Sequence, residues 1–542
     1  MKGCSNAAFF ILNKIVRSNL NYRKFKNQFS FTKTTAMKKN KNYNRREFVK
    51  TAAAASVAFT IIPRNVLGGP GFIAPSDKIN IAYIGCGTQG LAEMCDLLPN
   101  PEIQIVSVCD PNKFSTDYID WNANRIKDGI RKVLENPIWG NSYNGIPGGR
   151  DIGKELVDTY YGKKASGSYK TCSSYIDFRE LLEKEKDIDA VKIMTPDHLH
   201  GYISVAAMKK GKHVVIHKPI ANRMYEARMV IETAKQTGTS THLLAWSKRS
   251  GNALAKKWID EGLIGNLKEI HNWSNRPVWP QWTAKPKDIP PVPEGFNWDL
   301  WLGLVPDRPY HPNYTHNVFR GWYDFGGGAI ADMGHYSLWP MFLTLGINTA
   351  PYSAEAFGTT TRIIDGNVSR PVINDVAFPV SSIIRFKFPK QETLPEFELF
   401  WYDGGMKPNT PEELGDASLE AEGMMFVGDK GKILAGFRTE TPRLLPDNKS
   451  DSYRMKTYME GKEPYKENIE GGGPHWINAF KNKTQSPGSF LNAGAVTETI
   501  LLGAVALQAR KKVLYDSQNM KITNDENANK FLYREYRKGW EM

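Results

Sequence analysis

Short apolar runs alternate with amphipathic stretches in the first half of the chain, from residue 77 to about residue 245. The runs have the length of buried strands rather than of helices. Their alternation with helical stretches is typical of βαβ units, in which crossover helices join parallel strands. The predicted strands are Ile79–Ile84, Ile103–Cys109, Ala190–Met194, His213–Ile216 and Thr239–Leu244. We therefore predict an α/β domain with a parallel sheet over residues 77–245.

The pattern changes after Trp246, where short β-rich runs follow one another. Such a series predicts a mainly antiparallel sheet, which we assign to a second domain over residues 246–542. Its predicted strands are Leu267–Trp273, Ser353–Arg362, Ser381–Phe388, Glu396–Tyr402 and Gly423–Leu434. A helix predicted over Gly494–Lys512 has a nearly unbroken apolar surface, so we expect it to pack between other elements. Residues 115–170 exceed the length of a simple crossover and predict an insertion near the cofactor end of the first sheet.

The first predicted strand runs directly into a glycine-rich turn and then into a predicted helix. The turn has the spacing Gly85-x-Gly87-x-x-Gly90, with Thr88 and Gln89 between the last two glycines. In this context the first glycine permits the tight turn, the second lets the backbone approach a pyrophosphate, and the third lets helix and strand pack closely. The phosphates would lie over the helix N-terminus. The sequence therefore predicts a dinucleotide-binding Rossmann turn.

An acidic residue follows the second predicted strand. Asp110 lies twenty residues beyond Gly90, where a carboxylate can accept hydrogen bonds from both hydroxyls of the adenosine ribose. The same carboxylate would repel the 2′-phosphate of NADP. We therefore predict NAD as the cofactor and regard NADP as disfavoured.

The net charge of +14 would suggest a nucleic-acid partner if it were spread over the chain. Residues 1–50, however, contain thirteen Lys and Arg and one acid, Glu47, so the remaining chain is nearly neutral. This basic segment ends in Arg45-Arg46 and is followed by an apolar stretch from Thr51 to Ile62. The arrangement resembles a twin-arginine export signal. We therefore expect no nucleic-acid partner, a leader over residues 1–76, and export to the periplasm or beyond.

No segment outside this leader is apolar enough to predict a membrane span, and the apolar part of the leader is too short for one. The five cysteines show neither the spacing of a zinc site nor the pattern of a disulfide framework. We predict no metal site and expect Cys86, Cys95, Cys109 and Cys172 to be small buried residues.

Several motifs beyond the glycine turn resemble the Gfo/Idh/MocA family of oxidoreductases. They are Thr195–His200, Ala206–Val214, His217–Pro219, Gly326–Tyr336, Phe426–Lys432 and the terminal Tyr536–Trp540. The resemblance covers nearly all of the chain after the leader. It implies a Rossmann domain followed by an α/β domain with an open sheet, and a sugar site between the sheet face and the nicotinamide.

The resemblance also implies that Lys218 is the catalytic residue. In the family, the lysine of a Glu-Lys-Pro motif removes the hydroxyl proton, and a lysine near the positively charged nicotinamide can have its pKa lowered for this task. Here His217 precedes the lysine, which puts the contacts of the family's glutamate in doubt. The residues expected around the cofactor, beyond the glycine turn and Asp110, are Thr195, Pro196, Asp197, His200, His217 and Lys218.

The second-domain motif offers two candidates to assist Lys218. Family members usually place His, or in one branch Tyr, four residues after an Asp, and Tyr336 has that position relative to Asp332. His335 is at i+3 and would lie on the same helix face, so the spacing excludes neither residue. The resemblance favours Tyr336 as a substrate contact or proton relay. His335 is then a second contact or a packed histidine.

Six of the fourteen tryptophans lie between residues 273 and 322, among Arg and Tyr residues. Aromatic rings can cover the apolar faces of sugars, although Trp is also a common core residue. We expect two or three of these rings to contact substrate. Arg276 and Trp322 are our substrate-binding candidates.

Three functions are compatible with these features. The leading one is an NAD-dependent oxidoreductase acting on a secondary hydroxyl of a sugar, glycoside or polyol, with a tightly bound cofactor that is carried through export. The second is an NAD-dependent redox-assisted glycosidase. The third is a non-catalytic sugar-binding protein, against which Lys218, Asp110 and the glycine turn argue. The resemblance further implies a homo-oligomer paired through exposed sheet faces.

Overall fold

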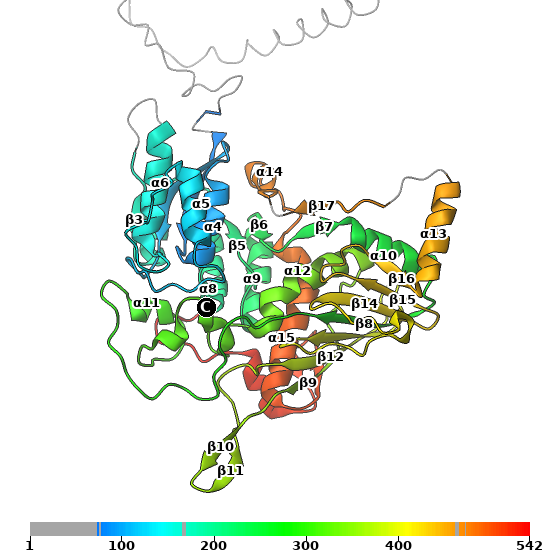
Figure 1. Ribbon diagram of the computed structural model, residues 1–542. Coiled ribbons are helices and arrows are strands. Elements are labelled where there is room, and N and C mark those ends of the chain that lie inside the picture. Colours follow the sequence, from blue (N-terminus) through cyan, green and yellow to red (C-terminus); the bar gives the residue numbers. More distant parts are fainter. Residues whose placement is uncertain (1–72, 75–76, 165–169, 461–464, 472) are drawn as a thin grey trace, which may run out of the picture. The chain divides into compact units, whose positions relative to one another are not determined.

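The computed structural model describes residues 73–74, 77–164, 170–460, 465–471 and 473–542. The predicted twin-arginine leader lies outside these residues, apart from Ile73 and Ala74. Among the helices of the described part, none combines the length and the apolar character needed to cross a membrane. Residues 65–542 form one compact unit that contains two main sheets (Figure 1).

Six parallel strands form the first sheet, in the order β3-β2-β1-β4-β5-β6. They are β1 (Ile79–Ile84), β2 (Ile103–Cys109), β3 (Ser173–Tyr175), β4 (Ala190–Ile193), β5 (His213–Ile216) and β6 (Thr241–Leu243). The predicted parallel sheet is confirmed, and β3 is the strand that the prediction lacks, because Ser-Ser-Tyr has no apolar pattern. The strand order reverses between β1 and β4, where sheets of this kind bind ligands at their carboxyl edge.

Helices cover both faces of this sheet. They are α4 (Thr88–Leu97), α5 (Arg125–Leu134), α6 (Arg150–Lys164), α7 (Phe178–Lys184), α8 (Asp197–Lys209) and α9 (Met224–Thr237). Ile81 and Tyr83 of β1 belong to the hydrophobic cluster that includes α4, α5 and α6, whereas Ala82 and Ile84 belong to the cluster that includes α7, α8 and α9. Burial on both faces explains why β1 reads as a continuous apolar run.

Residues 115–170 were predicted to be an insertion, but only part of this segment is an insertion. α6 packs against β2 and β3 and is the crossover helix between them. The irregular part before α6 reaches the second half of the chain. Asn112 forms an isolated backbone bridge with Phe296, and the N–H of Lys113 donates to the carbonyl of Gly295 at 2.9 Å. This connection lies near the end of β2.

Nine strands form the second sheet, in the order β16-β15-β14-β8-β13-β12-β9-β18-β19. They are β8 (Leu267–Trp273), β9 (Ser353–Gly358), β12 (Ser382–Phe388), β13 (Phe397–Tyr402), β14 (Gly423–Gly428), β15 (Lys432–Ala435), β16 (Arg443–Leu445), β18 (Val513–Asp516) and β19 (Lys521–Ile522). In this sheet β8 and β13 pair in parallel and the other described pairs are antiparallel, which confirms a mainly antiparallel sheet. The single run predicted over Gly423–Leu434 is the hairpin of β14 and β15.

Helices α10 (Ser250–Asp260), α12 (Gly328–Leu345) and α15 (Gly494–Ala509) accompany this sheet (Figure 1). Alternate residues of β12 are buried, as expected for a strand with one face on the core. α15 packs against β9, β12, α9 and α12. These contacts on several sides confirm the packing expected from its apolar sequence.

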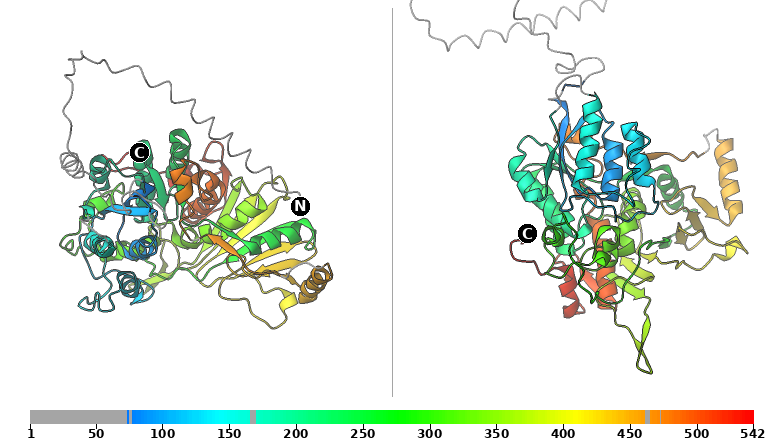
Figure 2. Two further views of the ribbon diagram at one scale, coloured as in Figure 1. Left: turned by 90° about the horizontal axis from the view of Figure 1, so that it is seen from above. Right: turned by 60° about the vertical axis from the view of Figure 1, so that its left-hand side comes forward.

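The remaining elements are short. They are β7 (Ser247–Arg249), paired with β17 (Ile469–Gly471); the hairpin of β10 (Arg362–Asp365) and β11 (Val368–Pro371), which Figure 2 shows extending away from the second sheet; the helices α11 (Trp298–Leu302), α13 (Asp447–Met459) and α14 (Ile477–Lys481); and the 3₁₀ helices Pro312–Tyr314, His316–Gly321, Glu412–Leu414, Phe490–Asn492 and Glu526–Leu532. α14 returns to the first half of the chain and packs against β1.

Two close backbone approaches fix the glycine turn. Gly85 has a φ of +103°, and a Cβ at this position would lie 2.6 Å from the carbonyl carbon of Met194. A Cβ on Gly90 would clash with the carbonyl oxygen of Gly85. α4 therefore begins directly against the end of β1, as the spacing of the glycines predicts.

Replacing Gly90 by Ala should lower the free energy of unfolding by about 1–3 kcal/mol, because backbone must move to accept the methyl group. Gly162→Ala in α6 is the matched control, since a Cβ there meets no atom within 4 Å. The control should be neutral or raise the free energy of unfolding by up to about 1 kcal/mol. Denaturant titration measures both values, and equal effects would contradict the close approach.

Candidate active site

A cleft at the carboxyl ends of β1 and β4 brings together most of the predicted cofactor residues. The cleft is lined by Gly85, Gly87, Thr88, Gln89, Gly90, Asp110, Thr195, Pro196 and His217. The predicted residues Asp197, His200 and Lys218 are not in its lining and lie behind it. Its position is the one at which a sheet with this strand order binds a dinucleotide.

The cleft has groups that fit the pyrophosphate and the adenosine ribose of a dinucleotide. The N-cap of α4 is Gly87, and no side chain caps the first-turn N–H groups of this helix. Such N–H groups suit a pyrophosphate. Asp110 accepts hydrogen bonds from the N–H groups of Cys86 (2.7 Å) and Asn112 (2.8 Å). Burial raises the pKa of its carboxyl, and these two N–H donors oppose the increase. The lone pairs that remain on the carboxylate suit ribose hydroxyls.

The cleft lining also includes residues that no sequence motif singled out. They are Pro111, Asn112, Tyr118, Phe296, Trp301, His316, Asn317, Phe319 and Arg320. The rings of Tyr118 and His316 lie 3.9 Å apart between centroids. Most of these residues belong to irregular segments or 3₁₀ helices, where neither periodicity nor a motif could identify them. Trp301, one of the six clustered tryptophans, is the exception.

Lys218, just beyond the end of β5, and Asp332 in α12 form a buried ion pair with 2.5 Å between Nζ and Oδ1. The two residues are 2% and 6% exposed. Burial alone would raise the pKa of the Asp332 carboxyl, but the charges of Lys218, Arg320 and Arg276 lower it to about 2, so the group is ionised. Burial lowers the pKa of the Lys218 amine, and Asp332 opposes the decrease. The carboxylate therefore both holds the amine and limits its loss of a proton.

Two arginines approach the same carboxylate. Nε of Arg276 lies 3.4 Å from Oδ2 of Asp332, and Nε of Arg320 lies 3.3 Å from Oδ1. Arg276, predicted as a substrate contact, thus lies beside the predicted catalytic lysine. No motif in the sequence pointed to Arg320. Because Arg320 also lines the cleft, it connects the dinucleotide site with Lys218.

Tyr336 and His217 meet beside Lys218. The Tyr336 hydroxyl lies 3.0 Å from Nε2 of His217, and Nζ of Lys218 lies 5.2 Å from the centroid of the Tyr336 ring. Burial, together with the charges of Lys218 and Arg320, lowers the pKa of His217 well below its ordinary value, so the imidazole is neutral. Burial raises the pKa of Tyr336, so its hydroxyl keeps its proton. The histidine that replaces the family's glutamate therefore orients the tyrosine.

His335 lies in a different environment. It is fully buried, and its Nε2 lies 3.3 Å from Oγ1 of Thr497 in α15. Burial lowers its pKa to about 3, so the ring is neutral. Of the two residues that the spacing left open, Tyr336 is the one beside Lys218, and His335 is packed between helices.

Asp197 and His200, predicted as cofactor contacts, instead brace the backbone around the site. Asp197 accepts a hydrogen bond from the N–H of Gly327, at the start of α12, at 3.2 Å. The His200 ring contacts the carbonyl oxygens of Thr195 (2.8 Å) and Pro219 (2.6 Å). These bonds hold the turns that follow β4 and β5. The sequence missed this role because a contact between two turns leaves no periodic pattern.

Trp322 is a core residue, which corrects its prediction as a substrate contact. It is 1% exposed, its indole N–H donates to the carbonyl of Asn313 at 2.7 Å, and its ring stacks on Trp282.

Cys86, Cys95, Cys109 and Cys172 are buried free thiols, and their burial was predicted. Across the described residues, no group of three or more His, Cys, Asp or Glu side chains has the arrangement of a metal site.

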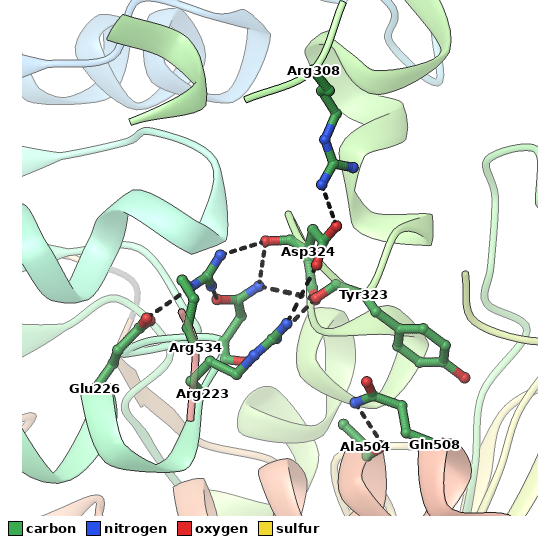
Figure 3. Close-up of polar contacts among 10 residues, drawn as sticks. Arg223, Glu226, Arg308, Tyr323, Asp324, Ala504, Gln508 and Arg534 are labelled. Carbon is green, nitrogen blue, oxygen red and sulfur yellow. Dashed lines mark hydrogen bonds and ion pairs between the residues drawn. The ribbon is translucent and has the colours of Figure 1, made fainter. Parts of the chain in front are cut away.

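A charged network joins three segments that are distant in sequence (Figure 3). Nε of Arg534, near the C-terminus, lies 2.8 Å from Oε1 of Glu226 in α9. Its other nitrogens donate to the carbonyl of Asp324, at 2.9 Å, and to the side-chain oxygen of Asn222. The Glu226 side chain is fully buried and that of Arg534 is 4% exposed. The network therefore holds a charge pair that water does not reach.

The same network holds together the two segments that carry the ion pair. Asn222, four residues after Lys218, donates to the carbonyl of Gly326 at 3.3 Å, six residues before Asp332. Arg308 pairs with the carboxylate of Asp324 at 2.5 Å (Figure 3). These contacts fix the start of α12 relative to the end of β5. They set the position of Asp332 against Lys218.

Two family models match the chain, one in each half. The model described as an oxidoreductase family, NAD-binding Rossmann fold, matches residues 161–243, and that described as an oxidoreductase family, C-terminal alpha/beta domain, matches residues 253–360. These two segments of the chain therefore match the two domains of the Gfo/Idh/MocA oxidoreductase family. The first match contains Lys218 and the second contains Asp332, so both members of the ion pair lie in Gfo/Idh/MocA domains.

Individual Gfo/Idh/MocA relatives align over part of the chain. A levoglucosan dehydrogenase of Pseudarthrobacter phenanthrenivorans is 35% identical over 115 residues, which are 20% of this chain and 29% of the relative. An alpha-N-acetylgalactosaminidase of Shewanella oneidensis is 23% identical over 242 residues, 42% of this chain and 44% of the relative. The chain thus spans less than half the length of these curated relatives. A solved WlbA dehydrogenase from Bordetella pertussis, in complex with NADH and UDP-GlcNAcA, is 13% identical with a TM-score of 0.47, covering 81% of this chain and 99% of that chain.

Replacing Arg534 by Met should lower the free energy of unfolding by about 3–5 kcal/mol, because it leaves the buried Glu226 carboxylate without its partner. Glu226→Gln in the same chain should recover part of the loss. Arg537→Met is the control, since its partners Asp299 and Asp307 have side chains 70% and 79% exposed. This control should cost less than about 1 kcal/mol. Denaturant titration compares the variants, and equal losses for Arg534 and Arg537 would contradict the role of the network.

Proposed function

We propose that this chain is an NAD-dependent oxidoreductase acting on a secondary hydroxyl of a sugar, glycoside or polyol. The observation that carries the proposal is the buried pair of Lys218 and Asp332, 2.5 Å apart, next to a cleft that suits a dinucleotide. The match to the NAD-binding domain of an oxidoreductase family supports it. The partial match to a levoglucosan dehydrogenase supports a carbohydrate substrate.

Lys218 is the general base in the proposed reaction. Its uncharged amine accepts the proton of the substrate hydroxyl as the C–O bond becomes a carbonyl. When bound, NAD supplies the acceptor for the hydride that leaves the same carbon. Asp332 keeps the amine in place and stabilises its protonated form, and the Tyr336 hydroxyl, oriented by His217, hydrogen-bonds the substrate oxygen. Burial of Lys218 keeps water from competing for the proton.

Replacing Lys218 by Met should lower the rate of cofactor reduction by about 10²–10⁴-fold and leave NAD binding intact, because the side chain is removed as a base but keeps its length. The rate is followed as NADH absorbance with a panel of sugars and glycosides, and cofactor content is measured after denaturation. Lys184→Met, at a side chain 62% exposed, is the control and should keep full activity. Full activity of the Lys218 variant would exclude the lysine as the base.

Asp332→Asn should shift the rising limb of the pH–rate profile to lower pH. Lys218 acts when its amine is uncharged, so the rate rises as the pH passes the pKa of this group. The Asp332 carboxylate raises that pKa, and its charge is lost in the variant while Arg276 and Arg320 remain. The measurement is the pH of half-maximal rate, which is independent of the absolute rate. An unchanged or higher value would contradict the assigned roles.

A redox-assisted glycosidase is the second candidate. It is supported by the partial matches to proteins named glycosyl hydrolase family 109 protein and alpha-N-acetylgalactosaminidase. Oxidation at one sugar carbon would acidify the neighbouring C–H, so that the glycosidic bond could be eliminated with release of the alcohol. Water would then add to the resulting double bond, and return of the hydride would restore the hydroxyl. The products separate the candidates: one NADH and one keto sugar per turnover support the dehydrogenase, and bond cleavage without net NADH supports the glycosidase.

We also propose that the protein is exported by the twin-arginine route and carries its cofactor with it. This rests on Arg45-Arg46 and the apolar stretch that follows them. The proposed homo-oligomer rests on the family resemblance. Immunoblotting of cell fractions tests the localisation, and light scattering of the purified protein tests the oligomer.

A further inference from the structure

The substrate end of the site carries more positive than negative side chains. Lys218, Arg276 and Arg320 surround the single carboxylate of Asp332. A fourth cation, Arg438, lies over the ring of Tyr336, with its guanidinium carbon 4.8 Å from the centroid. Four cations therefore gather around one acid and one neutral phenol.

The neighbouring acids offset only part of this excess. Asp197 interacts with the charges of Arg320 and Lys218, whereas Glu93 pairs with Lys192 at 2.9 Å. Glu440 pairs with Arg249, at 3.4 Å, and accepts from the backbone N–H of Arg438. Within the described residues, the guanidinium of Arg438 has neither a carboxylate partner nor a hydrogen-bond acceptor. Its charge is thus available for a ligand.

The cofactor does not account for Arg438. The N–H groups at the start of α4 suit the pyrophosphate, and of the four cations only Arg320 is among the described residues that line the dinucleotide cleft. Arg276 pairs with Asp332 and Arg438 lies over Tyr336, and neither arginine is among the described residues that line the cleft. A neutral sugar has no charge to offer an unpaired guanidinium there, whereas a carboxylate or sulfate accepts paired N–H donors from it.

We propose that the substrate is an anionic sugar and that Arg438 binds its acidic group beside Tyr336. The shared chemistry is an oxyanion on the sugar, either the carboxylate of a uronic acid or a sulfate ester. Arg276 adds to the positive field at this end of the site, and the Tyr336 ring lies near both Lys218 (5.2 Å) and Arg438 (4.8 Å). The acidic group is thus bound beside Tyr336 by a cation other than the catalytic lysine. This inference rests on the proposed function for the location of the sugar.

Equilibrium binding to the full chain loaded with NADH tests the inference. The probes are methyl glycosides of gluco, galacto and manno configuration, each as the neutral sugar, the 6-carboxylate and the 6-sulfate, titrated by calorimetry. For the configuration that fits, we expect an anionic form to bind at least about 10-fold more tightly than its neutral form. The carboxylate and sulfate arms identify the acidic group. Added salt should weaken only the anionic forms.

Arg438→Gln should reduce the ratio of the anionic to the neutral affinity to about one. Arg370→Gln is the matched control. This arginine lies in β11, its side chain is 59% exposed, and it pairs with Asp365 of β10. The control should leave the ratio unchanged. Anionic sugars that bind no more tightly than their neutral forms, including the case in which neither binds, would overturn the inference.

Cofactor reduction distinguishes this result from a failure of the proposed function. Neutral sugars that reduce bound NAD without any preference for an acid would leave the dehydrogenase standing and remove the anionic substrate. An anionic sugar that binds through Arg438 but reduces no cofactor would keep the binding site and remove the proposed oxidation.

Discussion

The arrangement of the site depends on one buried contact, the ion pair of Lys218 and Asp332. Taking both charges out of water costs several kcal/mol per ion, and a close contact offsets this only if the remaining hydrogen-bonding capacity is used. Arg276 and Arg320 lie at ion-pair distance from the same carboxylate and add two positive charges to the contact. An apolar pair of the same volume would serve stability as well, so the contact is better explained by proton transfer. It places a base with a lowered pKa where the two halves of the chain meet.

The fold supports this contact with polar side chains that touch no substrate. His200 holds the turns after β4 and β5, Asp197 holds the start of α12, and Arg534 joins α9 to the segment before α12. The bonds of Asp197 and Arg534 join segments more than one hundred residues apart in sequence, whereas those of His200 join neighbouring turns. Small shifts in any of them would change the distance from Lys218 to Asp332, and a base must be placed to within a fraction of an ångström.

The sequence predicted the parts of the structure that local rules determine. The glycine turn and the strands beside it follow from backbone sterics and from burial on both faces, which both leave a short-range pattern. Arg320 and Arg438 were not predicted, because a short 3₁₀ helix and a turn carry them to the site through the tertiary fold alone. The i+3 and i+4 spacing could not separate His335 from Tyr336, since the neighbouring helix α15 decides which residue is packed. Trp322 shows the same limit, because composition does not distinguish a core ring from an exposed one.

The return of α14 to β1 affects how the protein emerges from the ribosome. Trp476 and Phe480 belong to the same hydrophobic cluster as Ile81 and Val215, although the last strand of the first sheet ends at Leu243. At about 5–20 residues per second, synthesis takes roughly 10–50 seconds to travel from that strand to α14. During this interval the nascent first domain exposes part of its apolar face. A chain interrupted between the two sheets would lack the side chains that cover this face, which would then stay in contact with water.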